Sequence, residues 1–209
     1  MDPDKLRITG GKARSRKLIA PRATGKDCIR PTSDRVREAL FSILGQAVSG
    51  ARVLDLFAGT GSFGLDALSR GAGLVIFADE FPRALELVRK NLHNCFERPP
   101  AEVIRLDLSR ESSYMILNKR FGQQFPFDII FLDPPYEKKL AETSLTMIEK
   151  TGLVASKGVV IAEERWNVAL PKRIGTLCLH LHRRYGETGI WIYNQQARDR
   201  QSMLNGTTE

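Results

Sequence analysis

The stretch that decides the fold is Phe127-Asp128-Ile129-Ile130-Phe131-Leu132-Asp133-Pro134-Pro135-Tyr136. Five of its first six residues are apolar, which predicts a strand buried on both faces. The strand must end at the two prolines, because proline cannot donate to a sheet ladder. In an open α/β sheet, ligands bind at the carboxyl ends of the strands. The stretch therefore predicts an acid, a backbone carbonyl and an aromatic ring at the mouth of a crevice, although Asp-Pro-Pro is also ordinary turn chemistry.

Short apolar runs alternate with helical patterns on both sides of this stretch. Strands are expected over residues 53–57, 74–79, 103–106 and 158–162, and helices over 34–46, 65–70, 83–96, 109–120 and 138–150. Strands that alternate with helices form a parallel sheet with helices on both faces. Residues 176–184 and 188–193 alternate in polarity and predict a terminal antiparallel hairpin. We therefore predict an α/β fold with one main domain.

The amino-terminal part is predicted to be a small basic hairpin outside the main core. Two short strands, 6–9 and 17–20, flank a turn at 10–12. Residues 1–37 carry eleven basic and four acidic groups, so that +7 of the chain's net charge of +8 lies there. Such an asymmetric basic end is typical of proteins that bind a phosphate backbone. A basic tail that only raises solubility would have the same composition.

Composition excludes several other classes of protein. No run approaches the ~18 apolar residues of a membrane helix, and the first residues are charged, so that we expect a cytoplasmic protein. Cys28, Cys95 and Cys178 show no Cys-x-x-Cys spacing and are expected to be free thiols. His180 and His182 share one face of a predicted strand without a third ligand, so that no metal is expected. We also expect a monomer.

A glycine-rich turn follows the strand predicted over 53–57. Residues 59–64 match Gly-x-Gly-x-x-Gly, and Asp79 follows Gly61 at about the ~20-residue spacing of a dinucleotide site. A nicotinamide enzyme is thus one reading, but an acid at Asp55 is unfavourable beside a pyrophosphate. The run Asp55 to Gly61 instead resembles the first motif of class I S-adenosylmethionine-dependent methyltransferases. That resemblance implies cofactor contacts from these residues: Asp55, Phe57, Gly59, Gly61, Asp79 and Asp107.

Asp55 would hold the cofactor's amino group indirectly, and Asp79 would accept its ribose hydroxyls. Asp107 resembles the acid that contacts the adenine amino group in this superfamily, and a helix cap before Ser109 is the alternative role.

Asp133-Pro134-Pro135-Tyr136 resembles the (Asp/Asn)-Pro-Pro-(Tyr/Phe) signature of methyltransferases that act on exocyclic amino groups of nucleobases. Such a nitrogen is a poor nucleophile, because its lone pair is delocalised into the ring. The Asp133 carboxylate and the Pro134 carbonyl can hold its two hydrogens and direct the lone pair at the methyl group, while Tyr136 stacks on the extruded base. We expect Asp133, Pro134, Pro135 and Tyr136 to form the catalytic site.

Taken together, residues 6–194 resemble the RsmD family. The resemblance is carried by the basic hairpin with residues 14–18, the segment 30–38, the cofactor turn, the Asp133 tetrapeptide and the stretch 185–189. It implies a Rossmann-like, seven-stranded methyltransferase that modifies N2 of a guanine, numbered 966 by convention, in 16S ribosomal RNA of an assembled small subunit. One departure is Asp79, where many members carry glutamate.

The resemblance also implies a division of the chain. Residues 1–30 would be the RNA-contacting extension, 31–194 the methyltransferase domain and 195–209 a disordered tail. The residues expected to contact RNA are Arg14, Arg16, Lys17, Arg30, Arg35 and Arg37. A DNA adenine-N6 methyltransferase would share the tetrapeptide, but this chain has little extra mass for reading a duplex. A nucleic-acid-binding protein without catalysis is the alternative of another class.

Overall fold

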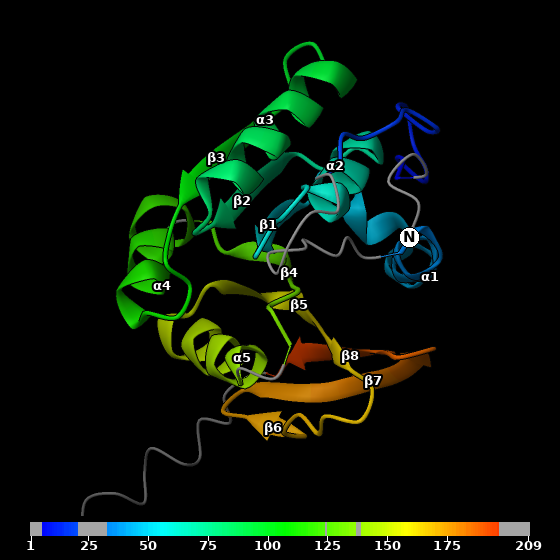
Figure 1. Cartoon of the computed structure of the whole chain (residues 1–209). Coiled ribbons are helices and arrows are strands. Elements are labelled where there is room, and N and C mark those ends of the chain that lie inside the picture. The colour runs from blue at the N-terminus through cyan, green and yellow to red at the C-terminus, as the bar shows by residue number, and fades with distance from the viewer. Residues whose placement is uncertain (1–5, 21–32, 124, 137–138, 197–209) are drawn as a thin grey trace, which may run out of the picture.

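Eight strands form one sheet in the computed structural model, which describes residues 6–20, 33–123, 125–136 and 139–196 (Figure 1). The strands are β1 (Arg52–Leu56), β2 (Leu74–Asp79), β3 (Ala101–Arg105), β4 (Phe127–Leu132), β5 (Val154–Arg165), β6 (Arg173–Ile174), β7 (Leu177–Tyr185) and β8 (Thr188–Gln195). Their spatial order is β3-β2-β1-β4-β5-β8-β7-β6. In this order the first five strands are mutually parallel. The pairs β5–β8, β8–β7 and β7–β6 are antiparallel.

The predicted α/β fold is confirmed, but the sheet has one strand more than the seven expected. The additional strand is β6, which contributes two residues at the sheet edge and pairs with β7. β5 also begins four residues earlier than the strand predicted from Gly158. Its first part, with Ser156 and Lys157 exposed, has no continuous apolar pattern that would reveal it as a strand.

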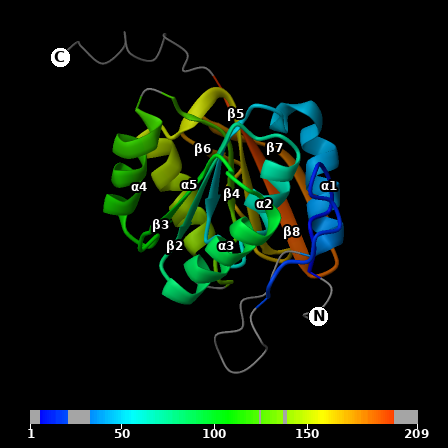
Figure 2. The same ribbon diagram turned by 90° about the horizontal axis from the view of Figure 1, so that it is seen from above.

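Helices cover both faces of the sheet (Figure 2). They are α1 (Asp34–Leu44), α2 (Ser62–Ser69), α3 (Pro82–Cys95), α4 (Glu111–Leu117) and α5 (Leu140–Thr151). Side chains from α1, α2 and α3 share one apolar cluster, and those from α4 and α5 share the other. The buried strand β4 contributes to both clusters through alternate side chains: Ile129 and Phe131 to the first, Ile130 and Leu132 to the second. Burial on both faces explains its continuous apolar sequence.

α1 begins where its sequence predicts. The hydroxyl of Ser33 accepts a hydrogen bond from the Val36 backbone nitrogen, which satisfies one of the free donors of the first turn. Asp34 adds a negative charge at the same end, where the helix dipole favours it. The helix ends at Gly45, whose φ of 55° lies in the left-handed region that glycine tolerates.

The N-terminal segment, residues 6–20, packs into the core, so the expectation of a hairpin outside it is wrong. Leu6, Ile8, Ala13 and Leu18 are buried in the cluster of α1 to α3. In place of two strands, the segment has one isolated antiparallel bridge, between Arg7 and Lys17. Figure 1 shows the segment in blue beside α1 and α2. Its apolar side chains are therefore part of the fold.

Polar groups of α2 fix the N-terminal segment in place. One carboxylate oxygen of Asp66 accepts hydrogen bonds from the Thr9 nitrogen at 2.7 Å and the Gly10 nitrogen at 3.3 Å. The hydroxyl of Ser69 accepts from the Ala13 nitrogen and donates to the Gly10 carbonyl. Asp66 and Ser69 are buried, and buried polar groups must be paired to be tolerated. The backbone of the segment thus provides the hydrogen-bond partners that the buried Asp66 and Ser69 side chains of α2 require.

Arg37 completes this buried network. Its guanidinium donates to the other oxygen of Asp66 at 2.8 Å, and it also contacts Asp34 and the Arg7 carbonyl. Both side chains of the Arg37–Asp66 pair are fully buried. Removing one partner of such a pair leaves a buried charge uncompensated, which costs about 3–5 kcal/mol. The ion pair therefore stabilises the packing of α1 and α2, and the hydrogen bond from Arg37 to the Arg7 carbonyl connects the N-terminal segment to both.

Candidate active site

The candidate site lies at the carboxyl edge of the parallel strands, where the strand order reverses direction. β1 pairs with β2 on one side and with β4 on the other. The register aligns Leu56 with Ala78 of β2 and with Leu132 of β4, and aligns Leu132 with Ala162 of β5. The segments that follow these residues therefore meet at one edge. This position is the topological switch point at which open α/β sheets bind ligands.

Asp55 lies inside β1, one residue before its end, and is 2% exposed. Its Oδ2 accepts a hydrogen bond of 2.9 Å from the Gly64 nitrogen in the first turn of α2. Burial raises the pKa of this carboxyl to about 8, the Gly64 hydrogen bond opposes the shift, and the nearby charge of Asp79 adds to it. A cationic group bound at this edge would favour the ionised carboxylate.

Asp79 is the last residue of β2, and its carboxylate accepts hydrogen bonds from two loops, the turn after β1 and the turn before α3. Its Oδ2 accepts from the Gly59 nitrogen at 2.9 Å, and its Oδ1 accepts from the Phe81 nitrogen at 2.9 Å. Burial raises the pKa of Asp79, while these backbone hydrogen bonds lower it. The acid thus ties the glycine-rich turn after β1 to the start of α3.

The turn between β1 and α2 has a sharply bent backbone. Gly59 and Gly61 have positive φ angles of 54° and 75°, and so does Phe57, at 58°. A bulky residue rarely adopts this region, and such conformations gather at ligand sites. A Cβ on Gly61 would lie 3.1 Å from Val88 and 3.2 Å from Phe77, so that the turn is closely packed.

Asn91 of α3 joins this turn to the N-terminal segment. Its amide nitrogen donates to the Thr60 carbonyl and to the Ile19 carbonyl, both at 3.1 Å, and its oxygen accepts from the Ile19 nitrogen. The side chain is fully buried. Nothing in the sequence distinguishes Asn91, because an asparagine within an amphipathic helix is usually solvated.

Asp107 follows β3 at the same edge and is the most exposed of the three acids predicted to contact the cofactor. Its carboxylate accepts from the hydroxyl and nitrogen of Ser109 and from Arg110. The hydrogen bond from the Ser109 hydroxyl is the main cause of a lowered pKa for Asp107. These contacts form a turn before α4, but Asp107 does not cap that helix, whose N-cap is Arg110 without a side-chain hydrogen bond.

Asp133-Pro134-Pro135-Tyr136 follows β4 directly. Pro134 is buried, Pro135 is exposed, and Asp133 and Tyr136 are half-buried. The Tyr136 hydroxyl donates to Oε1 of Glu163, at the end of β5, over a long 3.4 Å. Burial raises the pKa of Tyr136, and the charges of Glu163 and Asp133 raise it further. Both carboxylates therefore lie close to the hydroxyl.

Two glutamates of β5 are buried near the same edge and are not among the predicted site residues. Glu163 and Glu164 are 3% and 2% exposed, and they follow the apolar run that predicted this strand. An apolar strand with an acidic residue at its carboxyl end is the pattern that identifies Asp79 and Asp133. The same pattern applied to β5 would have found Glu163.

The basic residues expected to contact RNA have different environments. Arg14, Arg16, Lys17 and Arg35 are exposed, and Arg30 lies outside the described residues. Arg16 also donates to the Asn94 and Cys95 carbonyls at the end of α3. Arg37 is fully buried and ion-paired, so its assignment to RNA contact is wrong. A single sequence does not distinguish an arginine on the helix surface from one that pairs with a distant buried acid.

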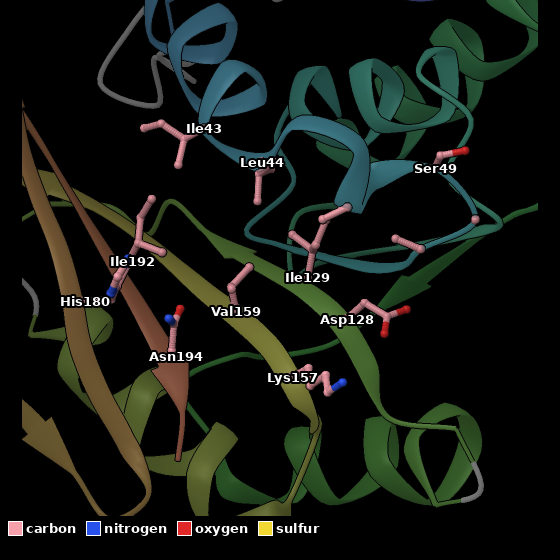
Figure 3. Close-up of a pocket in the computed structure, with 13 residues that line it drawn as sticks. Ile43, Leu44, Ser49, Asp128, Ile129, Lys157, Val159, His180, Ile192 and Asn194 are labelled. Carbon is pink, nitrogen blue, oxygen red and sulfur yellow. The ribbon is translucent and has the colours of Figure 1, made fainter. Parts of the chain in front are cut away.

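A cavity of about 520 Å³ lies at the opposite, amino end of the parallel strands (Figure 3). Ile43 and Leu44 of α1 face Ile129, Val159 and Ile192 of the sheet across it. None of the predicted catalytic or cofactor residues lines this cavity. The cavity is therefore separate from the carboxyl-edge site.

Other predictions concern thiols, metals and membranes. Cys95 and Cys178 are free thiols, and Cys28 lies outside the described residues. Of the tail predicted over 195–209, residues 197–209 also lie outside them, and Gln195 is not part of a tail because it ends β8. His182 stacks on Trp191, with ring centroids 4.3 Å apart. In the described ranges, no histidine, cysteine and acid side chains gather in a group that could hold a metal ion. No helix of that part of the chain is long and apolar enough to span a membrane.

Comparison with known proteins yields matches along nearly the whole chain. The family model described as "Conserved hypothetical protein 95" matches residues 6–194. The Bacillus subtilis (strain 168) protein "Putative rRNA methyltransferase YlbH" is 35% identical over 191 residues, 91% of this chain and 100% of that protein. "Ribosomal RNA small subunit methyltransferase D" of Escherichia coli (strain K12) is 33% identical over 195 residues, 93% and 92% of the two chains. The solved structure "Putative methyltransferase yhhF from Escherichia coli" superposes with a TM-score of 0.76 at 29% identity, over 92% of this chain and 99% of that one.

Proposed function

The chain belongs to the RsmD family, and from that membership we propose that it transfers the methyl group of S-adenosylmethionine to the exocyclic N2 amino group of a guanine in 16S ribosomal RNA of the small subunit. The observation that carries this proposal is the register of β1 and β4, Leu56 with Leu132. It aligns the glycine-rich turn with Asp133-Pro134-Pro135-Tyr136. A methyl donor held by the turn would lie beside an amino group held by the tetrapeptide.

The chemistry of the cofactor side fits S-adenosylmethionine. Asp55 is a buried acid with a pKa near 8, which an ammonium group nearby would stabilise in its charged form. Asp79 ends the neighbouring strand and would accept the ribose hydroxyls, while Phe57, Gly59 and Gly61 shape the turn that approaches the cofactor. Asp107 would approach the adenine amino group. When bound, the cofactor supplies an electrophilic methyl group on its sulfonium.

The base side provides the acceptors that a flat amino group needs. The Asp133 carboxylate and the Pro134 carbonyl would accept its two hydrogens, which aims the nitrogen lone pair at the methyl group. The ring of Tyr136 would stack on the extruded base. Proline fixes φ at both Pro134 and Pro135, so that Asp133 and Tyr136 have little freedom to reorient. Correct alignment of two reactants is worth about 7–11 kcal/mol of the barrier.

The N-terminal segment would contact the RNA. Arg14, Arg16 and Lys17 are exposed on it, and Arg35 is exposed on α1. The apolar side of the same segment is anchored on α2, so the charges are presented from a fixed backbone. In this proposal residues 1–30 provide the RNA contact, 31–194 transfer the methyl group, and the substrate is the assembled small subunit.

The test is methyl transfer from labelled S-adenosylmethionine to naked ribosomal RNA, to small subunits and to DNA, followed by nucleoside analysis. N2-methylguanosine from the small subunit or its RNA is the expected product. Label in N6-methyladenine of DNA would overturn the proposal in favour of the rival enzyme. Absence of transfer to all three substrates, with cofactor bound, would favour the non-catalytic binding protein.

A further inference from the structure

Two consecutive glutamates near the end of β5 are buried, and they point to opposite faces of the sheet. Glu163 is 3% exposed and pairs in register with Ile190, which belongs to the apolar cluster of α1 to α3. Glu164 is 2% exposed, and its Oε1 accepts from the Arg165 nitrogen. Opposite faces follow from the alternation of side chains along a strand. Carboxylates are rarely buried without a specific reason, and the fold gives different surroundings to these two.

Glu163 shares its face with the acids of the candidate site. Asp55 pairs in register with Phe131, and Ile161 lies two residues before Glu163, both in the cluster of α1 to α3. Leu132 pairs with Ala162, so Asp133, which directly follows β4, and Glu163 of β5 are the residues next to this pair. The Tyr136 hydroxyl donates to Glu163 at 3.4 Å. The raised pKa of Tyr136, caused by burial and then by Glu163 and Asp133, agrees with two acids meeting at this hydroxyl.

Two acceptors side by side complement one edge of guanine. On that edge, N1–H and the N2 amino group are neighbouring donors, whereas the other neighbour of N2, the ring atom N3, is an acceptor. The amino group of adenine has a ring acceptor on each side. A carboxylate next to the one that holds the amino group therefore attracts the N1–H of guanine and repels the N1 of adenine.

We propose that Glu163 selects guanine by accepting the hydrogen bond from its N1–H, while Asp133 and the Pro134 carbonyl hold the N2 amino group. This inference rests on the proposed function and assigns the choice of base to a residue outside the Asp133 tetrapeptide. The Tyr136 hydroxyl holds the Glu163 carboxylate in position, and its 3.4 Å hydrogen bond is long enough to be replaced by a shorter one from the base. Glu163 rejects adenine because an acceptor facing a buried carboxylate is unfavourable.

The test replaces the guanosine at the methylated position of the RNA by 2-aminopurine riboside. This base keeps the 2-amino group but carries an acceptor in place of N1–H. Wild-type enzyme should prefer guanosine by about 10- to 100-fold in kcat/KM, the range for a hydrogen bond to a charged group. Glu163→Gln should reduce that preference to a few-fold, because the amide can donate to N1 of 2-aminopurine.

Two further variants separate base selection from a structural role. Glu164→Gln is the matched control, a buried glutamate on the same strand facing the other way, and it should keep the wild-type preference. Glu163→Asp should keep the preference at a reduced rate, because it retains the charge. An unchanged preference in Glu163→Gln that still binds cofactor would overturn the inference and leave the proposed function intact. A wild-type product other than N2-methylguanosine would overturn the proposed function, and this inference with it.

Discussion

At the carboxyl edge, the acids make different contacts on the cofactor side, formed by the ends of β1 and β2, and on the base side, formed by the ends of β4 and β5. On the cofactor side, Asp55 and Asp79 accept hydrogen bonds from backbone nitrogens of Gly64, Gly59 and Phe81, so that each acid also shapes a loop. On the base side, Asp133 follows the end of β4 next to a rigid proline pair, and the Tyr136 hydroxyl contacts Glu163 of β5. Substitutions on the cofactor side should therefore change stability and binding together. Those on the base side should change transfer and leave the fold intact.

Asp133→Ala should produce the largest effect and is the sharpest test of this difference. Loss of one acceptor at the reacting nitrogen should reduce kcat by about 10²- to 10³-fold or more, by analogy with other single transition-state contacts. Cofactor affinity and the unfolding temperature should stay near wild type. Asp128→Ala is the matched control, because Asp128 lies on the same strand at its opposite end and is exposed. A variant at Asp133 that keeps more than a tenth of the activity would contradict its role.

Asp79→Ala should affect both binding and stability. Loss of the ribose contact should weaken S-adenosylmethionine binding about 10- to 100-fold in calorimetry. The Gly59 and Phe81 nitrogens also lose their acceptor, so that the free energy of unfolding should fall by about 1–3 kcal/mol. Asp79→Glu, which keeps the carboxylate, should recover part of both. Unchanged affinity in the alanine variant would rule out the ribose contact.

Two substitutions of Tyr136 separate its ring from its hydroxyl. Tyr136→Ala should lose about 1–3 kcal/mol of base contact, the usual value of aromatic stacking on a base, seen as a higher KM for RNA. Tyr136→Phe keeps the ring and loses the contacts of the hydroxyl with Glu163 and Thr188, so its effect should be mild. Equal and severe loss in both variants would mean that the hydroxyl takes part in the reaction and that stacking is not the main role.

The pKa of Asp55 predicts how stability depends on pH without cofactor. The unfolded carboxyl titrates near its ordinary value of 3.8, and the folded one near 8. Between these values the folded protein holds a proton that the unfolded chain has released, so stability falls as pH rises, by about 1.4 kcal/mol per unit for this one group. Asp55→Asn should flatten this slope in urea unfolding between pH 5 and 7. A parallel slope in wild type and variant would show that Asp55 is already ionised.

The smallest effect is expected from the exposed basic residues, which belong to the base side. The double change Arg14→Ala, Lys17→Ala should weaken RNA binding and reduce the slope of log affinity against log salt by about 0.7 for each lost phosphate contact. Cofactor affinity should not change. Because Leu6, Ile8, Ala13 and Leu18 are buried, deletion of residues 1–20 would unfold the core and would not isolate RNA binding. An RNA affinity independent of salt would contradict electrostatic contact.

Much of the fold and of the site follows from strand ends in the sequence. Buried strands have continuous apolar runs, and Asp79 and Asp133 mark where such runs end. Because the carboxyl ends of parallel strands lie at one edge of the sheet, these residues can be predicted to lie close together before their contacts are known.

What the sequence did not predict depends on polar contacts between distant residues. Arg37 and Asp66 form a buried pair across 29 positions, and Asn91 reaches Ile19 across 72. Each of these polar residues sits in a helix, where a polar side chain usually faces solvent. Only the packed structure shows that their side chains point inward, which is why the sequence pattern wrongly predicts an RNA contact for Arg37 and a surface position for the N-terminal segment.

The anchoring of the N-terminal segment also determines when it can fold during synthesis. The segment leaves the ribosome before its partners Asp66, Ser69 and Asn91, which follow 57, 56 and 72 residues after the groups that they bind. At ~5–20 residues per second, its apolar residues and its positive charge remain unpacked for several seconds while α2 and α3 are made. The N-terminal segment thus completes its packing only after α2 and α3 have emerged, and until then a basic, partly apolar peptide lies next to the ribosome's own RNA.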